Sequence, residues 1–178
     1  MANFIGYQLA WFITVAGAGR GLAWPGIVAT VTFSVIQLIA SNQRVLDAKL
    51  LSMALLFGLL CDGALQRLSW VEFEAPAPGI LHDYAPLWIL SLWLAFSLTL
   101  NRSLSWLQSR PWMAALFGAI GAPLAYTAAG RGWSALQFTT PTYRGELWLA
   151  LCWGLAMYLF ARTVIRSRTT APQYPETP

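Results

Sequence analysis

The stretch KLLSMALLFGLLCDGALQRLS, residues 49–69, decides how this chain folds. It is long and apolar enough to cross a hydrocarbon core of about 30 Å as an α-helix, since a helix rises about 1.5 Å per residue. It also carries Asp62 well inside the apolar run, where a charge costs about 3 kcal/mol or more. The stretch therefore predicts a membrane helix built around one polar centre.

Five more apolar stretches surround this one. Hydrophobic residues make up 57% of the 178 residues and charged residues only 10%, whereas a soluble domain has about 25% charged residues. The six stretches cover residues 3–19, 22–41, 49–69, 85–101, 112–130 and 147–165. A backbone in lipid must satisfy its own hydrogen bonds, and we find no alternation of apolar and polar residues typical of a strand barrel. We predict an all-α polytopic membrane bundle of about six transmembrane helices.

The connections between these stretches are short, so we expect one transmembrane domain over residues 1–165 and a flexible polar tail over residues 166–178. The first stretch could instead be a cleaved signal peptide, because Ala16-Gly17-Ala18 resembles a cleavage site. Signal peptides begin with a positively charged region, and no basic residue precedes Arg20. Retention of the first helix is favoured, and cleavage would leave five helices in the same orientation.

The basic residues predict the orientation of the bundle, because short loops rich in Lys and Arg stay in the cytoplasm. Seven of them share the side of the two termini: Arg44, Lys49, Arg102, Arg110, Arg162, Arg166 and Arg168. Four lie on the other side: Arg20, Arg67, Arg131 and Arg144. This asymmetry predicts a multi-pass membrane protein with both termini in the cytoplasm. The net charge of +4 then reflects orientation, and we expect no nucleic-acid partner.

Asp62 is the candidate polar centre. Four residues of its helix share one face: Gly58, Asp62, Gln66 and Ser69. Such a polar face belongs in the bundle interior or beside a water-filled cavity. Arg20 and Arg131, at the outer ends of the first and fifth helices, are the best-placed partners for an ion pair with Asp62. Asp62 is then either a structural group, paired or hydrogen-bonded to Gln66 and neighbouring helices, or a proton- or substrate-coupling group.

The fifth apolar stretch predicts close helix packing. Gly118, Ala122 and Ala125 recur at spacings of three and four, and small residues on one face allow neighbouring backbones to approach. Pro123 lacks a backbone donor and should kink this helix. We therefore expect helix five to be a central helix.

Three tryptophans lie in the middle of apolar stretches: Trp11, Trp93 and Trp153. They are either lipid-facing or packed bulk, or part of a site where a ligand ring stacks.

We recognise no catalytic or cofactor-binding motif in the sequence. We find no nucleophile elbow, phosphate-binding loop, haem attachment motif or paired metal ligands, and the chain has one histidine and two cysteines. We therefore expect no catalytic residue, no metal and no cofactor, although a membrane enzyme acting on lipid stays open as a less favoured alternative.

Several short motifs together resemble a family of small, uncharacterised proteobacterial inner-membrane proteins, catalogued as a domain of unknown function. These motifs are Asn3-Phe4, residues 8–12 (QLAWF), Gly17-Ala18 before Arg20, Asp62, residues 101–107 (NRSLSWL) and residues 118–126 (GAIGAPLAY). The family supplies no activity and no functional residues. The resemblance implies a lipid-related role, since genes of its members often neighbour those of lipid-modifying enzymes such as cyclopropane-fatty-acid synthase-like proteins.

The favoured function is that of a non-catalytic accessory or partner-binding protein in a membrane-lipid or envelope process. Its expected partners are membrane lipids and another membrane protein or a second copy of the chain. The alternative is a small transporter that uses Asp62 as a coupling or substrate residue. A cavity that reaches Asp62 would favour transport, and a packed, dry Asp62 would favour the structural role.

Overall fold

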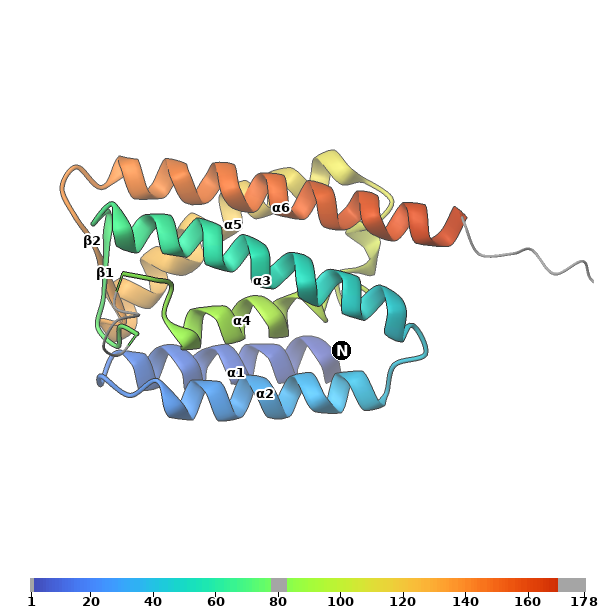
Figure 1. The fold of residues 1–178 in the computed structure, drawn as a ribbon, viewed down its shortest axis with the longest axis horizontal. Coiled ribbons are helices and arrows are strands. Elements are labelled where there is room, and N and C mark those ends of the chain that lie inside the picture. The colour runs from blue at the N-terminus through green and yellow to red at the C-terminus, as the bar shows by residue number, and fades with distance from the viewer. Residues whose placement is uncertain (1, 78–82, 170–178) are drawn as a thin grey trace, which may run out of the picture.

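Six α-helices form one elongated bundle in the part of the chain that the computed structural model describes, residues 2–77 and 83–169 (Figure 1). The helices are α1 (Ala2–Ala18), α2 (Trp24–Ile39), α3 (Arg44–Arg67), α4 (Leu87–Ser97), α5 (Pro111–Trp133) and α6 (Tyr143–Thr169). A short 3-10 helix, η2 (Ser105–Leu107), lies between α4 and α5. The predicted helical bundle is confirmed in its class and in its six helices.

Three of these helices, α3, α5 and α6, are long and apolar enough to cross a membrane. The other three are shorter, with 17 residues in α1, 16 in α2 and 11 in α4. About 20 residues are needed to span a hydrocarbon core of ordinary thickness. Three membrane-capable helices are therefore established by length and composition, and six spans remain a prediction.

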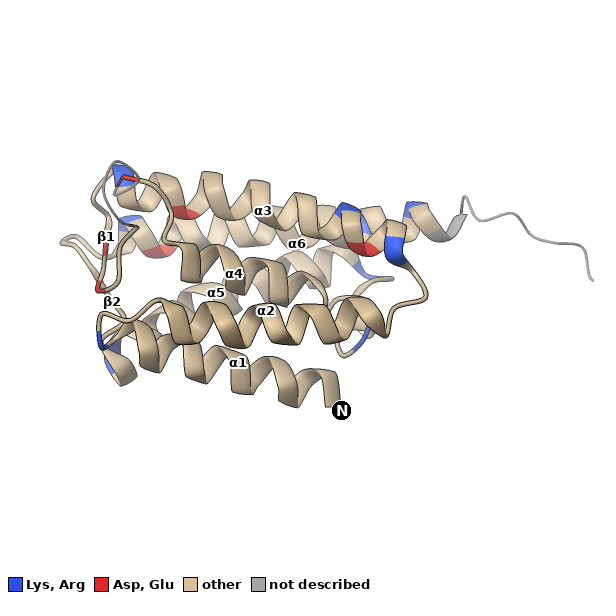
Figure 2. Ribbon diagram, turned by 60° about the horizontal axis from the view of Figure 1, so that its bottom comes forward, with Lys and Arg blue, Asp and Glu red and all other residues tan. Residues whose placement is uncertain are grey.

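Charged residues gather at the two ends of the bundle, and the stretch between the ends is almost free of them on the drawn ribbon (Figure 2). Large apolar side chains instead cover the outside of the long helices, including Leu60 on α3, Leu124 on α5 and Leu151 on α6, which are 62%, 64% and 71% exposed. A folded protein in water rarely exposes such a continuous apolar surface. The surface suits a protein whose middle is surrounded by lipid.

The shortest helix, α4, occupies the centre. Eight of its eleven residues are buried, among them Trp88 and Trp93 at 1% exposure each. It packs against α2 on one side and α3 on another. The expectation that helix five is central is therefore wrong. Helices α4 and α5 are both apolar around their circumference, so hydropathy could not tell a lipid-facing surface from a buried one.

The remaining helices surround α4. Helix α1 packs on α2, α3 packs on α6, and α6 packs most extensively on α5. Helices α1 and α5 are neighbours, and the aromatic contacts between them are made by Trp133. The centroid of the Trp133 side chain lies 5.6 Å from that of Trp11 and 5.5 Å from that of Phe12. Trp133 is the last residue of α5. The seam between α1 and α5 is thus closed at one end and loosely packed along the rest.

A two-stranded antiparallel sheet closes that same end, which we call the sheet end (Figure 1). Strand β1 (Val71–Phe73) follows α3, strand β2 (Leu136–Phe138) follows α5, and Glu72 lies opposite Gln137. The sheet is a departure from the all-α prediction. Both segments alternate apolar and polar residues, so the pattern was present but only three residues long in each.

The opposite end, where α1 begins and α6 ends, is held by a buried polar network that the sequence analysis did not identify. Asp47 at the start of α3 is 2% exposed. One carboxylate oxygen accepts a hydrogen bond from the Ser41 hydroxyl, and the other accepts one from the Asn101 side-chain amide at 3.1 Å. The side-chain amide of Gln108 donates in turn to the Asn101 side-chain oxygen at 2.8 Å.

The first helix joins this end through its own polar contacts. The Asn3 amide donates to the side-chain oxygen of Gln37 at 2.9 Å, and the Ser103 hydroxyl donates to the Asn3 oxygen at 2.7 Å. Arg102 donates to the Gln37 carbonyl at 2.6 Å. The motif residues near the start of the chain and after α4 therefore meet in space and fix the ends of α1 and α2.

The expected polar tail begins inside α6, because this helix continues to Thr169 rather than ending near residue 165. Residues 170–178, which make up the rest of the predicted tail, lie outside the described residues.

The packing of α5 on α6 can be tested at two glycines of α5. A Cβ added at Gly118 would lie 2.5 Å from the Trp153 carbonyl oxygen, whereas one added at Gly121 would meet nothing within 4 Å. We expect Gly118→Ala to lower the free energy of unfolding by about 1–3 kcal/mol through overpacking. Gly121→Ala is the matched control and should be neutral or stabilising by up to about 1 kcal/mol.

Thermal melting of both variants in the same detergent measures this difference. Equal melting temperatures for the two variants would show that α5 and α6 are not in close contact at Gly118.

Candidate functional site

Asp62 lies completely buried where three helices meet. Its side chain is 0% exposed, on the last two turns of α3. One carboxyl oxygen accepts a hydrogen bond from the indole nitrogen of Trp93 on α4 at 2.7 Å, and the other accepts one from the Tyr126 hydroxyl on α5 at 2.5 Å. Each oxygen therefore has a donor, as a buried carboxyl group requires. The interaction joins α3, α4 and α5.

Gly58 explains why Trp93 can reach Asp62. Gly58 lies one turn before Asp62 on the same face of α3, and a Cβ there would be 2.8 Å from the Trp93 ring. The indole therefore lies directly against the α3 backbone. The face of α3 predicted to be polar therefore carries both the Asp62 carboxyl group and the glycine that leaves space for its donor, Trp93.

The two arginines expected beside Asp62 do not bind it. Arg20 is exposed and donates to the Ala16 carbonyl at 3.3 Å, and Arg131 is also exposed, near the end of α5. Within the described residues Asp62 has hydrogen-bond donors and no recorded ion pair. Neutral donors supplied by neighbouring helices replace the expected cation.

Gln66 is only partly buried, yet its side-chain oxygen is buried and has no hydrogen-bond partner among the described residues. The structure therefore does not join Gln66 to Asp62.

The small residues of α5 lie in two different environments, one against α6 and one beside a cavity. Gly118 contacts the α6 backbone at Trp153, as a packing residue should. Ala122 is 7% exposed, and both Ala122 and Ala125 line a cavity. Pro123 is partly buried, and α5 remains helical through it. The small face thus serves helix packing at Gly118 and leaves open space farther along.

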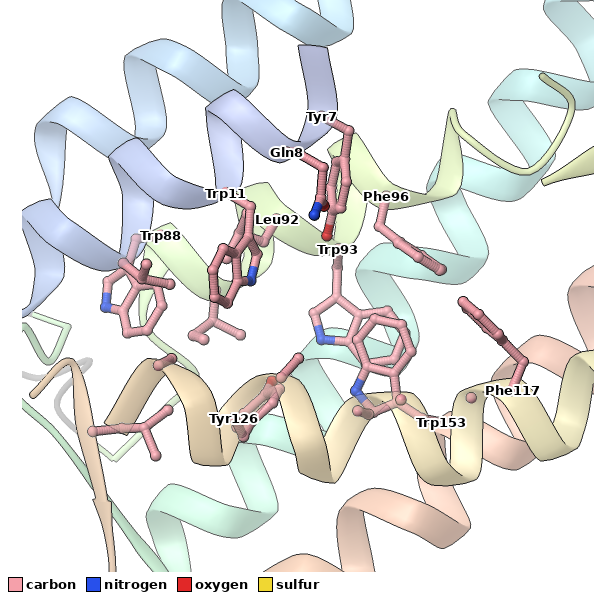
Figure 3. A pocket seen from close by; sticks show the side chains of 18 residues that line it. Tyr7, Gln8, Trp11, Trp88, Leu92, Trp93, Phe96, Phe117, Tyr126 and Trp153 are labelled. Carbon is pink, nitrogen blue, oxygen red and sulfur yellow. The ribbon is translucent and has the colours of Figure 1, made fainter. Parts of the chain in front are cut away.

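That open space is an aromatic cavity of about 300 Å³ between α1, α4 and α5, with Trp153 of α6 at its base (Figure 3). Eight of its 18 lining residues are aromatic: Tyr7, Trp11, Trp88, Trp93, Phe96, Phe117, Tyr126 and Trp153. Trp93 and Trp153 stack with ring centroids 3.8 Å apart. Phe117 at the rim is 41% exposed, so the cavity reaches the surface along the seam of α1 and α5.

A few polar groups interrupt this apolar lining. Tyr7 and Gln8 extend from α1 toward the cavity (Figure 3). The indole nitrogen of Trp153 is buried and has no hydrogen-bond partner within the described part of the chain. A mainly apolar cavity with a few fixed polar groups is typical of a small-molecule site.

Asp62 lies behind the cavity wall. Its two donors, Trp93 and Tyr126, both line the cavity, whereas Asp62 does not. A molecule in the cavity would contact the two donor rings. The carboxyl group therefore acts on the cavity by fixing the orientation of these rings.

The residues that sequence reasoning missed are Tyr126, Tyr7 and the partner role of Trp93. The mid-helix positions of Trp11, Trp93 and Trp153 were a usable signal, because all three line the cavity. No group of three or more potential metal-ligand side chains lies together in residues 2–77 and 83–169.

A family model described as "Protein of unknown function (DUF2878)" matches residues 1–159. No curated protein and no solved structure was found to match the chain.

The hydrogen bonds to Asp62 can be tested by double-mutant cycles. We expect Asp62→Ala and Tyr126→Phe each to destabilise the protein by about 1–3 kcal/mol. The double variant should lose less than the sum, by about 0.5–3 kcal/mol, because both changes remove one interaction. The measurement is the free energy of unfolding in detergent.

Arg20→Ala is the control for this cycle. Its combination with Asp62→Ala should be additive within about 0.5 kcal/mol, since the two side chains do not meet. Coupling of Asp62 to Arg20 and additivity with Tyr126 would reverse our assignment of the partner.

Proposed function

We propose that this chain, which belongs to the DUF2878 family of proteins of unknown function, is a multi-pass inner-membrane protein that serves as a non-catalytic accessory in a membrane-lipid or envelope process. Its partners would be membrane lipids together with another membrane protein or a second copy of the chain. The observation that carries the proposal is the aromatic cavity on the seam between α1 and α5.

Two properties of the cavity favour binding over chemistry. The described residues that line it are aromatic, aliphatic or small, apart from Gln8, and include no carboxylate, histidine or thiol. The one buried carboxyl group nearby, Asp62, has both oxygens occupied by Trp93 and Tyr126. Such a site can hold an apolar molecule, and it offers no ready acid, base or nucleophile for a reaction.

The surroundings of the cavity favour a lipid ligand. The exposed parts of α5 beside it are apolar, including Leu116 at 60% and Ile120 at 54% exposure. In a membrane these side chains would contact acyl chains, so lipid is the most abundant molecule at the rim. An apolar cavity of about 150 Å³ can bind benzene, so a cavity of about 300 Å³ has room for part of a lipid chain.

The alternative, a small transporter, draws support from Tyr126. The Tyr126 hydroxyl binds Asp62, and the Tyr126 side chain also lines the cavity. Movement of this single ring would connect Asp62 to the open space. Transport would then depend on the carboxyl group itself, so Asp62→Asn would abolish the cellular role although it preserves the shape. An accessory lipid-binding protein should retain its role in that variant if the variant folds.

Lipid analysis of a deletion strain tests the proposal. We expect an altered membrane-lipid composition, restored by the native protein. Gly121→Leu should fail to restore it, because a side chain at this position would extend into the cavity, where a Cβ meets nothing within 4 Å. Gly132→Leu is the matched control on the same helix, outside the cavity, and should restore the composition.

All three proteins must reach equal abundance in the membrane for this comparison. An unchanged lipid composition in the deletion strain would overturn the proposed role. Equal rescue by Gly121→Leu would exclude the cavity from it.

The proposed orientation has its own test. The described ends of α1 and α6 lie at the same end of the bundle, opposite the sheet (Figure 1), and the seven basic residues assigned to this side favour the cytoplasm. We expect a C-terminal fluorescent-protein fusion to be bright and a C-terminal alkaline phosphatase fusion to be inactive. A strongly active phosphatase fusion would reverse the orientation.

A further inference from the structure

A second cavity lies at the sheet end, bounded by the strands and the neighbouring ends of α5 and α6. Its volume is about 680 Å³, and we call it the sheet-end pocket. In contrast to the aromatic cavity, its lining is rich in polar groups, including Thr127, Ser134, Gln137 and Thr142. The two cavities therefore differ in the kind of chemical group that each can hold.

The two cavities adjoin each other. Tyr126 and Leu136 line both of them. Tyr126 is the residue whose hydroxyl is held by Asp62 at 2.5 Å, so its ring stands at a fixed position between the apolar and the polar space. One amphiphilic molecule could occupy both cavities with its apolar part on one side of this ring and its polar part on the other.

The charged residues of the sheet-end pocket indicate which polar group of a ligand it would bind. Glu72, Glu74 and Glu146 line it, against the single guanidinium group of Arg131. No ion pair is recorded for these three carboxylates within the described residues. Glu72 on β1 and Glu74, directly after the strand, are two residues apart and both exposed. Three carboxylates and one cation in the lining favour a ligand with a positive group and disfavour a purely anionic one.

We propose that the two cavities form one binding site for a zwitterionic phospholipid with an ammonium headgroup, with part of one acyl chain in the aromatic cavity and the headgroup in the sheet-end pocket. The glutamates would bind the ammonium group, and Arg131 would bind the phosphate. This inference rests on the proposed lipid-binding function and names the class of lipid. The headgroup then lies at a charged end of the bundle, where lipid headgroups lie in a membrane (Figure 2).

The aromatic cavity also runs in the direction that a bound acyl chain would take into the membrane. Trp88 and Ala129, near the sheet ends of α4 and α5, line the aromatic cavity together with Tyr7, which lies nearer the start of α1. The cavity thus extends from the sheet end toward the middle of the bundle. An acyl chain that enters from a headgroup at the sheet end follows the same course.

The test compares two lipids with identical acyl chains, phosphatidylethanolamine and phosphatidylglycerol, bound to the full chain in detergent. Native mass spectrometry gives the ratio of the two lipid-bound species. We expect the native protein to favour phosphatidylethanolamine about two- to fivefold, since one partly exposed ion pair contributes up to about 1 kcal/mol. Glu72→Gln combined with Glu146→Gln should bring the ratio close to one.

Two further variants separate the headgroup from the acyl chain. Glu72→Asp combined with Glu146→Asp retains both charges and should retain most of the preference. Gly121→Leu fills the aromatic cavity and should reduce binding of both lipids without changing their ratio.

Equal binding of the two lipids to the native protein would overturn the headgroup assignment, and so would an unchanged preference in the glutamine variant. In either case, loss of both lipids in Gly121→Leu would still support the acyl-chain cavity of the proposed function. Full binding of both lipids to Gly121→Leu would overturn the two-cavity site itself.

Discussion

The buried carboxyl group of Asp62 is the constraint on which the centre of this bundle depends. A carboxyl group removed from water must find donors, and it finds them on two other helices, at Trp93 and Tyr126. These two contacts set the rotation of α4 and α5 relative to α3. They also fix the two rings that form part of the cavity wall, so a structural interaction and the shape of a binding site have the same origin.

The other features of the fold accommodate this arrangement. Gly58 lets the Trp93 ring lie against α3, and Gly118 lets α5 approach the α6 backbone at Trp153. With α5 held on α6, and α1 packed on α2, the seam between α1 and α5 is closed mainly by Trp133. Dispersion holds membrane helices together only where surfaces fit. The surfaces of α1 and α5 do not fit along most of their seam, and the aromatic cavity lies there.

The two ends of the bundle are stabilised differently. At the sheet end, paired strands join the connections after α3 and α5. At the other end, the Asp47 carboxylate and the Asn3 amide gather side chains from four segments of the chain. Both devices satisfy polar groups where the chain leaves the apolar middle. They leave the middle of the α1–α5 seam without a polar link, which suits a site that exchanges an apolar ligand with its surroundings.

The sequence by itself determined the class of the protein: apolar stretches with few charges require helices that satisfy their own backbone, and residues 49–69 identify Asp62 as the polar centre of one of them. It also singled out Gly118 as a packing residue and three mid-helix tryptophans that line the cavity. Only the tertiary structure decided which helix is central, because α4 and α5 are both apolar all round. Only it paired Asp62 with Trp93 and Tyr126 in place of an arginine. These partners are 31 and 64 residues away along the chain, and no local pattern records which faces of separate helices will meet.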